Sequence, residues 1–182
     1  MLTEDNIQDI FEIADLLSNG DRELFLQLRE VVFASDPNYI LDLLESVLSP
    51  EAFDAFLDRV GESEKDNLLV ILLALLAHNQ YICVRPPKER LSDFIETFDR
   101  LQTVRRAGIS LKLDSNGLEP EKTLAEWADA IDKKFTAEQF CLGALEMSTD
   151  SLYLFFGKAK HLERVIELFI NLGYRAAYAK NM

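Results

Sequence analysis

Small polar residues gather at one point in the second half of the chain, Ser148-Thr149-Asp150-Ser151, between two apolar runs. Hydroxyl and carboxylate groups at the tip of a hairpin could hold a ligand or a partner, because the flanking strands would keep the turn rigid. The same residue types also stabilise tight turns by hydrogen bonding to their own backbone. The pattern favours turn formation, and Ser148, Thr149, Asp150 and Ser151 form the first candidate site.

A basic cluster follows the second apolar run and consists of Lys158, Lys160, His161 and Arg164. It falls where a strand is expected to pass into a helix, and free amide groups at a helix start can bind an anion together with such cations. The glycine spacing of a phosphate-binding loop is missing. A solvated basic helix face is therefore favoured over an anion site.

No further combination of residues indicates catalysis or metal binding. The two cysteines, Cys83 and Cys141, and the two histidines, His78 and His161, show neither Cys-x-x-Cys nor His-x-x-x-His spacing. There is no Gly-x-Ser-x-Gly motif, and neither histidine has a nucleophile close to it in the sequence. We therefore expect no cofactor, name no catalytic or metal-binding residue, and favour a non-enzymatic function.

The charge of the chain is unevenly distributed. Among 182 residues, 19 Lys and Arg stand against 32 Asp and Glu, a net charge of −13. Residues 1–80 hold 4 of the basic and 17 of the acidic side chains, whereas residues 81–182 hold 15 of each. This balance disfavours a nucleic-acid ligand, because a phosphate backbone would be repelled by the first half and would meet no net positive charge in the second.

Two explanations of the acidic half remain open. The carboxylates could form a docking face that steers a basic protein partner into place. They could also be solvated helix faces that keep the protein soluble. Solubility alone does not explain why the excess is confined to one half, so both explanations are kept.

Membrane insertion is not expected. The longest apolar run, Leu68 to Ala77, has ten residues, and a helix needs about 20 to span a bilayer. The chain begins with an acidic stretch where a secretory signal would be basic and then apolar. We therefore expect a cytoplasmic protein.

The elements that would position these residues differ between the two halves. The first half predicts five helices, opened by signals such as Asp36-Pro37 and Ser49-Pro50, in which a capping side chain precedes a proline. The helix over about 63–77 is apolar nearly all round and is expected to form the centre of the core. Residues expected to face inward from the two proline-started helices are Ile40, Leu43, Leu44, Val47, Phe53, Phe56, Leu57 and Val60.

The second half alternates strands and helices. Strands are expected over 81–85, 140–147, 151–156 and 174–179, with helices over about 91–101, 121–135 and 159–172; residues 108–120 could be a strand or a loop. This order is the ferredoxin-like βαββαβ arrangement with one inserted helix, in which the strands lie in the order 4-1-3-2. We expect an α+β fold in which an acidic helical bundle, residues 1–79, packs on this antiparallel sheet, residues 80–182, as one compact unit with a shared core.

This topology makes a prediction about the cysteines. Cys83 on the first strand and Cys141 on the second would be separated by the third strand, about 9–10 Å at normal sheet spacing. A disulfide needs Cα atoms within about 7 Å. Two free, mostly buried thiols are expected.

Residues 65–178 resemble an uncharacterised bacterial family that is known only as a domain of unknown function. The resemblance rests on an apolar helix leading into the strand Tyr81 to Arg85, on the hairpin from Met147 to Tyr153 with its serines and aromatic residue, and on a helix that ends at Gly173 before the last strand. After the first strand the family has an acidic residue and an aromatic-basic pair, where this chain has Arg85-Pro86-Pro87. The resemblance implies the α+β fold and no known activity.

Two functional hypotheses follow. The first is a non-enzymatic bacterial protein that binds a basic partner through residues 1–80, for example an antitoxin or immunity-type inhibitor whose acidic face masks a basic toxin. The alternative is an enzyme or small-ligand module with a carboxylate-lined pocket between the helical half and the sheet, using the turn from Ser148 to Ser151. The sequence does not indicate an oligomeric state.

Overall fold

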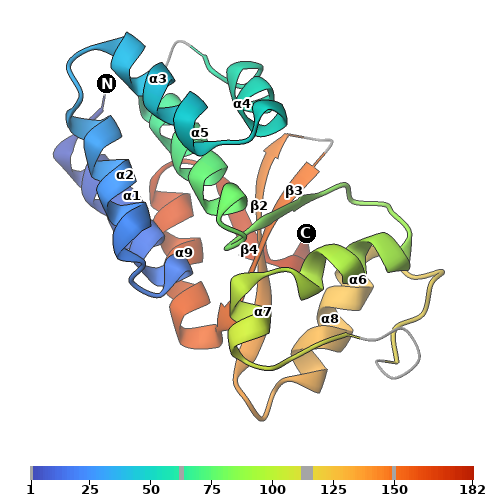
Figure 1. Ribbon diagram of the computed structural model, residues 1–182. Helices are drawn as coiled ribbons and strands as arrows, with labels where there is room; N and C mark the ends of the chain where they lie inside the picture. The colour runs from blue at the N-terminus through green and yellow to red at the C-terminus, as the bar shows by residue number, and fades with distance from the viewer. Residues whose placement is uncertain (1, 62–63, 112–116, 149–150) are drawn as a thin grey trace. The chain divides into compact units, whose positions relative to one another are not determined.

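The structure is a computed structural model that describes residues 2–61, 64–111, 117–148 and 151–182. The chain divides into two compact units, Met1–Asn79 and Gln80–Met182. Figure 1 labels their helices and strands.

Helices make up the described part of the first unit: α1 (Glu4–Ser18), α2 (Arg22–Phe33), α3 (Pro37–Val47), α4 (Pro50–Leu57) and α5 (Glu64–His78). Their starts follow from local hydrogen bonds. Thr3 Oγ1 accepts from the Asn6 amide at 3.1 Å, and Asn6 Oδ1 accepts from the Thr3 amide at 3.2 Å. Asp36 and Ser49 cap α3 and α4, each followed by proline, so both predicted start signals are confirmed.

Helix α5 forms the centre of this unit, as predicted. Its residues from Leu68 to Leu76 are buried except for Ala74, which is partly exposed. Within the unit it packs against α1, α2 and α4. A helix that is apolar on every side is stable in water only when it is enclosed in this way.

Helices α3 and α4 bury less than predicted. Only Leu44 of α3 and Phe56 of α4 are fully buried. Leu57 and Val60, both expected in the core, are 44% and 43% exposed, so that prediction is wrong. Helix α4 ends at Leu57, so Leu57 lies at its last position and Val60 lies beyond the helix.

The second unit contains four strands and four α-helices among its described residues. They are β1 (Cys83–Arg85), α6 (Leu91–Asp99), α7 (Gln102–Arg106), α8 (Leu124–Lys134), β2 (Phe140–Ser148), β3 (Ser151–Lys158), α9 (Ala159–Asn171) and β4 (Arg175–Tyr178), followed by the short 3₁₀ helix η1 (Ala179–Asn181). The segment 108–120 contains no strand in its described parts, 108–111 and 117–120.

The strands form one antiparallel sheet in the order β1-β3-β2-β4. The expected position of β3 between β1 and β2 is confirmed. The ferredoxin-like order is wrong at one edge, because β4 pairs with β2 instead of β1. Strand β1 has three residues and β2 has nine, so β2 offers the longer edge for hydrogen bonding.

This change of edge determines where the helices lie. The connection from β1 to β2 passes over β3, and the connection from β3 to β4 passes over β2, so both move in the same direction across the sheet. Their starting strands, β1 and β3, are antiparallel. If both crossovers are right-handed, their helices must cover opposite faces. That is the arrangement observed: α6 and α8 pack with Leu154 and Phe156 on one face, and Phe169 of α9 meets Phe155 on the other at 5.8 Å (Figure 1).

Both cysteines are free and buried, as predicted. Cys83 pairs in register with Leu154 of β3, and Cys141 pairs with Gly157 of the same strand, so β3 separates them. Cys83 belongs to the core on the α6–α8 face. Cys141 is one residue from Leu142 of that core, and successive residues of a strand point to opposite faces.

Both thiols are expected to be unreactive in the folded protein. Burial raises the pKa of Cys83 and of Cys141 to about 12, so only about one thiol in ten thousand is ionised at pH 8. A thiol reagent such as DTNB at pH 8 should therefore modify neither in the native protein and both in 6 M guanidinium. Rapid modification of one native thiol would contradict the buried placement.

None of the helices described is both long enough and apolar enough to cross a membrane.

Candidate functional site

The predicted polar turn lies at one end of the sheet. The backbones of Ser148 and Ser151 form the last pair of the β2–β3 ladder, after a shift of register between Glu146 and Ser148. Thr149 and Asp150 lie outside the described residues. The two serines are thus placed at the hairpin end, where β1 and β4 also bring Arg85 and Arg175 into the neighbouring rows of the sheet.

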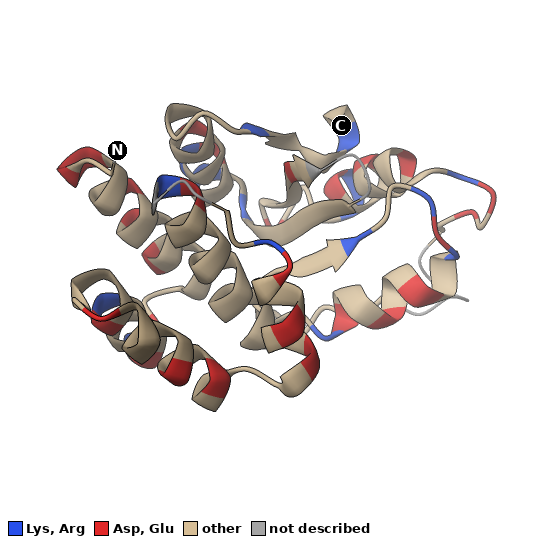
Figure 2. Ribbon diagram, turned by 90° about the horizontal axis from the view of Figure 1, so that it is seen from above, with Lys and Arg blue, Asp and Glu red and all other residues tan. Residues whose placement is uncertain are grey.

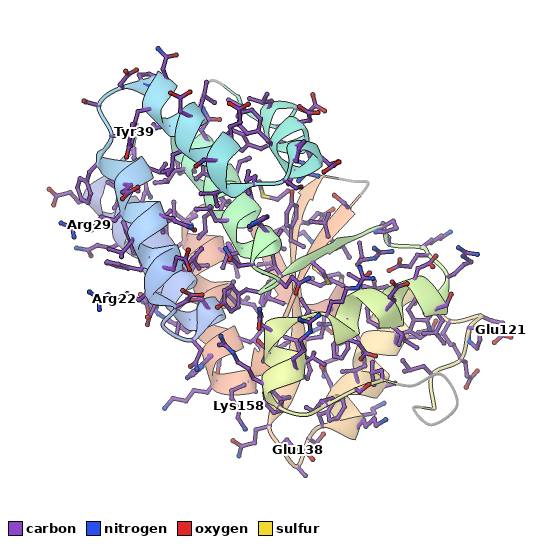
Figure 3. All side chains as sticks on the ribbon, in the orientation of Figure 1. Arg22, Arg29, Tyr39, Glu121, Glu138 and Lys158 are labelled. Atoms are coloured by element: carbon purple, nitrogen blue, oxygen red, sulfur yellow. The ribbon has the colours of Figure 1, made fainter. Side chains whose placement is uncertain are left out.

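The basic cluster lies at the opposite end of the sheet, where β3 enters α9. Lys158 donates through Nζ to the carbonyl oxygen of Glu138 at 2.6 Å and lies 4.4 Å from the centre of the Phe140 ring (Figure 3). Arg164 forms an ion pair with Glu167 at 3.0 Å. Lys160 and His161 are exposed. Two of the four side chains thus make contacts within the unit, as a basic helix face does.

A buried carboxylate, Asp132 on α8, was not predicted as a site residue. Its Oδ1 accepts from the amide of Leu142 at 2.9 Å, and its Oδ2 lies 3.7 Å from Nζ of Lys180. Leu142 lies one residue beyond the part of β2 that pairs with β4, so Asp132 completes the hydrogen bonding of β2 where the partner strand ends. Burial raises the pKa of Asp132, against the opposing effects of the Leu142 amide and Lys180.

The sequence held a signal for Asp132. It follows Ala128 by four residues and Ile131 by one, so it falls on the apolar stripe of its helix. An acidic residue in that position must find a hydrogen-bond partner inside the protein.

A pocket of about 310 Å³ lies beside the hairpin end of the sheet. We call it the sheet-end pocket. It is formed by Pro87 and Lys88 after β1, Thr123 to Ala125 at the start of α8, Glu146, Leu152 and Arg175 on the strands, and Ala179 and Met182 at the end of the chain. Leucine, alanine and methionine side chains line its interior, and Lys88, Glu146 and Arg175 supply its charges.

The loop that carries Lys88 is held by an ion pair. Arg85 donates from Nε to Oε1 of Glu89 at 2.9 Å and from its terminal nitrogen to the second oxygen of the same carboxylate. The side chain of Glu89 is only 5% exposed, and this bidentate contact raises the pKa of Arg85. Pro86 and Pro87 restrict the loop further. Lys88 is therefore presented from a constrained backbone.

A second surface lies on the first unit. Residues 30–58, called here the acidic segment, contain seven carboxylates and no lysine, arginine or histidine. All seven are exposed, and none is in an ion pair with another residue that the structure describes. They are Glu30, Asp36, Asp42, Glu45, Glu51, Asp54 and Asp58. In Figure 2 the helices of this unit carry many red and few blue residues.

Apolar side chains are exposed on the same helices. Phe33 is 72% exposed, Tyr39 49% and Leu57 44%. Between α2 and α3 a hollow of about 440 Å³ is lined by Leu26, Phe33 and Tyr39 together with Arg29, Glu30 and Ala34. Figure 3 shows Arg29 and Tyr39 projecting from these two helices.

A family model described as a domain of unknown function (DUF6630) matches residues 9–179. The chain belongs to the DUF6630 family. The expected membership in a family of unknown function is confirmed, and the match extends over both units, not only over residues 65–178. No curated protein and no solved structure matches the chain.

The DUF6630 match covers all seven carboxylates of the acidic segment and almost the whole lining of the sheet-end pocket; Met182 alone falls outside it. No group of three or more histidine, cysteine, aspartate or glutamate side chains suited to a metal ion occurs among the residues described. The sequence indicated the charge of the first unit, but not which carboxylates would stay exposed and unpaired, because that depends on how the helices pack.

Proposed function

We propose that this chain is a non-enzymatic, cytoplasmic protein-binding protein, and that its first unit docks a basic protein partner. The observation that carries the proposal is the acidic segment, in which seven exposed, unpaired carboxylates alternate with exposed Phe33, Tyr39, Leu41 and Leu57. Exposed apolar side chains surrounded by charged residues are typical of a surface that binds another protein.

In the second unit, side chains of opposite charge lie next to one another. It contains neighbouring ion pairs such as Lys133 with Asp129 at 2.6 Å and Arg90 with Asp93 at 3.0 Å. Residues 1–80 cannot do the same, because four basic side chains can neutralise at most four of 17 carboxylates one for one. Their excess charge stays available to a partner, and long-range attraction would speed its association.

The exposed apolar residues would contribute binding energy that the charges alone do not provide. A solvated acidic surface needs no aromatic side chain in water, and exposing Phe33 and Tyr39 costs hydrophobic free energy. Aromatic residues at the centre of an interface commonly supply most of the binding energy, while charges around them set partner choice. The combination supports a specific basic partner over a purely solubilising role.

The proposal predicts a salt-sensitive complex. The tagged full chain, recovered from its own host at about 50 mM salt, should retain a protein of basic isoelectric point that is released at about 300 mM. Neutralising three carboxylates with Asp42→Asn, Glu45→Gln and Asp54→Asn should weaken the recovered complex about tenfold or more, measured with the purified partner by calorimetry.

A matched control distinguishes a local docking surface from an effect of the net charge of the protein. Glu119→Gln, Glu121→Gln and Glu138→Gln remove the same three charges at exposed positions of the second unit and should leave the affinity within about twofold. Equal weakening by the two triple variants, or a complex that is indifferent to salt, would overturn the proposal.

A further inference from the structure

We propose that the sheet-end pocket binds a small amphipathic carboxylate, with the apolar body against Leu124, Leu152 and Met182 and the carboxylate at Lys88. This site lies wholly within the second unit. It is independent of the docking function proposed for the first.

The interior of the pocket suits an apolar body. Leu124 and Leu152 are core residues, 2% and 8% exposed, and Ala179 beside them is fully buried. None of these side chains carries a hydrogen-bonding group, so the interior offers contact area and little else. At about 310 Å³ the pocket is at the lower end of the range for small-molecule sites, which suits a body of about eight carbon atoms.

The charges around this interior select an anion. Arg175 and Glu146 form an ion pair across the β2–β4 ladder and largely cancel each other. Lys88 is exposed and is not in an ion pair with any described residue, so it is the one charged side chain of the lining without a partner of opposite sign. An ammonium ion on a flexible stem can meet a single carboxylate without rearranging its neighbours.

The loop that carries Lys88 is preorganised in the absence of a ligand. The bidentate contact of Arg85 with the nearly buried Glu89 spans the loop, and two prolines precede Lys88 within it. Less conformational freedom is then lost on binding, which raises affinity for a ligand of the right length. A cationic ligand of the same shape would instead face the Lys88 ammonium in the same pocket.

A series of ligands that share one chain tests the proposal. Octanoate, 1-octanol and octylammonium are titrated into the ¹⁵N-labelled full chain and followed by amide chemical shifts. Octanoate should bind with a Kd of about 1 mM or tighter, as expected for ten non-hydrogen atoms, and should shift the amides of Lys88, Leu152 and Ala179. Octanol should bind at least about fivefold more weakly than octanoate. Octylammonium should bind more weakly than octanol.

Two lysine variants test whether the carboxylate of octanoate binds at Lys88. Lys88→Gln should weaken octanoate about fivefold and leave octanol unchanged. Lys160→Gln removes the same charge from the basic cluster at the other end of the sheet and should change neither. The proposal is overturned if octylammonium or octanol binds as tightly as octanoate, if Lys88→Gln has no effect, or if the shifted amides lie outside the pocket.

Discussion

Replacing Gly143 by alanine is expected to lower the free energy of unfolding by about 3 kcal/mol. A Cβ atom at this position of β2 would lie 2.2 Å from Cε2 of Phe155 and 2.8 Å from two further atoms of the same ring. Gly143 and Phe155 are directly paired across the β2–β3 ladder, so the ring lies over the glycine backbone. The bare backbone is what makes room for the aromatic side chain.

The ring has little freedom to move away from an added methyl group. Phe155 is 1% exposed, and its other side meets Phe169 of α9 at 5.8 Å between ring centres. Accommodating alanine therefore requires a shift of Phe155, of α9 or of the β2 backbone, and each of these disturbs packing that is already dense. Urea unfolding followed by circular dichroism measures the loss.

Gly157 provides a control on the neighbouring strand. A Cβ atom there would lie 3.6 Å from Leu162, an ordinary contact, so Gly157→Ala should be neutral or stabilise by up to about 1 kcal/mol through a less flexible unfolded chain. Adding Phe155→Leu to Gly143→Ala should recover about 1 kcal/mol or more relative to additive effects. Equal stability of the two glycine variants would contradict the close contact.

Replacing Asp132 by alanine is expected to destabilise the protein by about 2 kcal/mol. The substitution leaves the buried amide of Leu142 without its acceptor at the point where β4 no longer pairs with β2. It also removes the partner of Lys180, at 3.7 Å, and so loosens η1. Asp129→Ala on the same helix breaks a surface ion pair with Lys133 and leaves the Leu142 amide bonded, so it should cost less than about 0.5 kcal/mol.

The variant Asp132→Asn separates the hydrogen bond from the charge. Its side-chain oxygen can still accept from Leu142, so at pH 7 its stability should lie within about 1 kcal/mol of the wild type. Because burial raises the pKa of Asp132 in the folded state, the folded protein binds this proton more tightly than the unfolded chain. The contribution of Asp132 to stability is therefore greatest at low pH and falls as the pH rises through its folded-state pKa.

The difference between Asp132→Asn and the wild type should follow this pH dependence. The asparagine variant cannot ionise, so its stability relative to the wild type should improve from pH 4 to pH 7, as measured by urea unfolding at each pH. A relative stability that worsens over this range would mean that the folded state favours the ionised carboxylate.

Much of the fold was predictable because its signals are local. The caps at Thr3, Asp36 and Ser49 act through hydrogen bonds to amides two or three residues away. Such bonds depend on the residue types present and not on the rest of the protein. The apolar run from Leu152 to Phe156 in β3 is a local signal too, since an uninterrupted apolar run is typical of a strand covered on both faces.

The edge taken by β4 was not predictable from the same kind of signal. Arg175–Tyr178 could pair antiparallel with either β1 or β2, and the two choices differ in the length of edge offered and in the face that α9 must cover. Both quantities involve residues far apart in the sequence. The partners of Asp132 were not predictable for the same reason, since Leu142 and Lys180 are 10 and 48 positions away.

The sequence by itself determined that the acidic excess belongs to residues 1–80, that the two halves differ in fold, and that the polar turn joins two strands. All three properties depend only on composition and on residues that are close together in the sequence. Only the tertiary structure decided that the seven carboxylates of residues 30–58 are exposed without ionic partners beside Phe33 and Tyr39, and that Lys88 lies beside an apolar pocket. Exposure and pocket lining depend on which surfaces the packed helices and strands leave uncovered, and those contacts join segments that are distant along the chain.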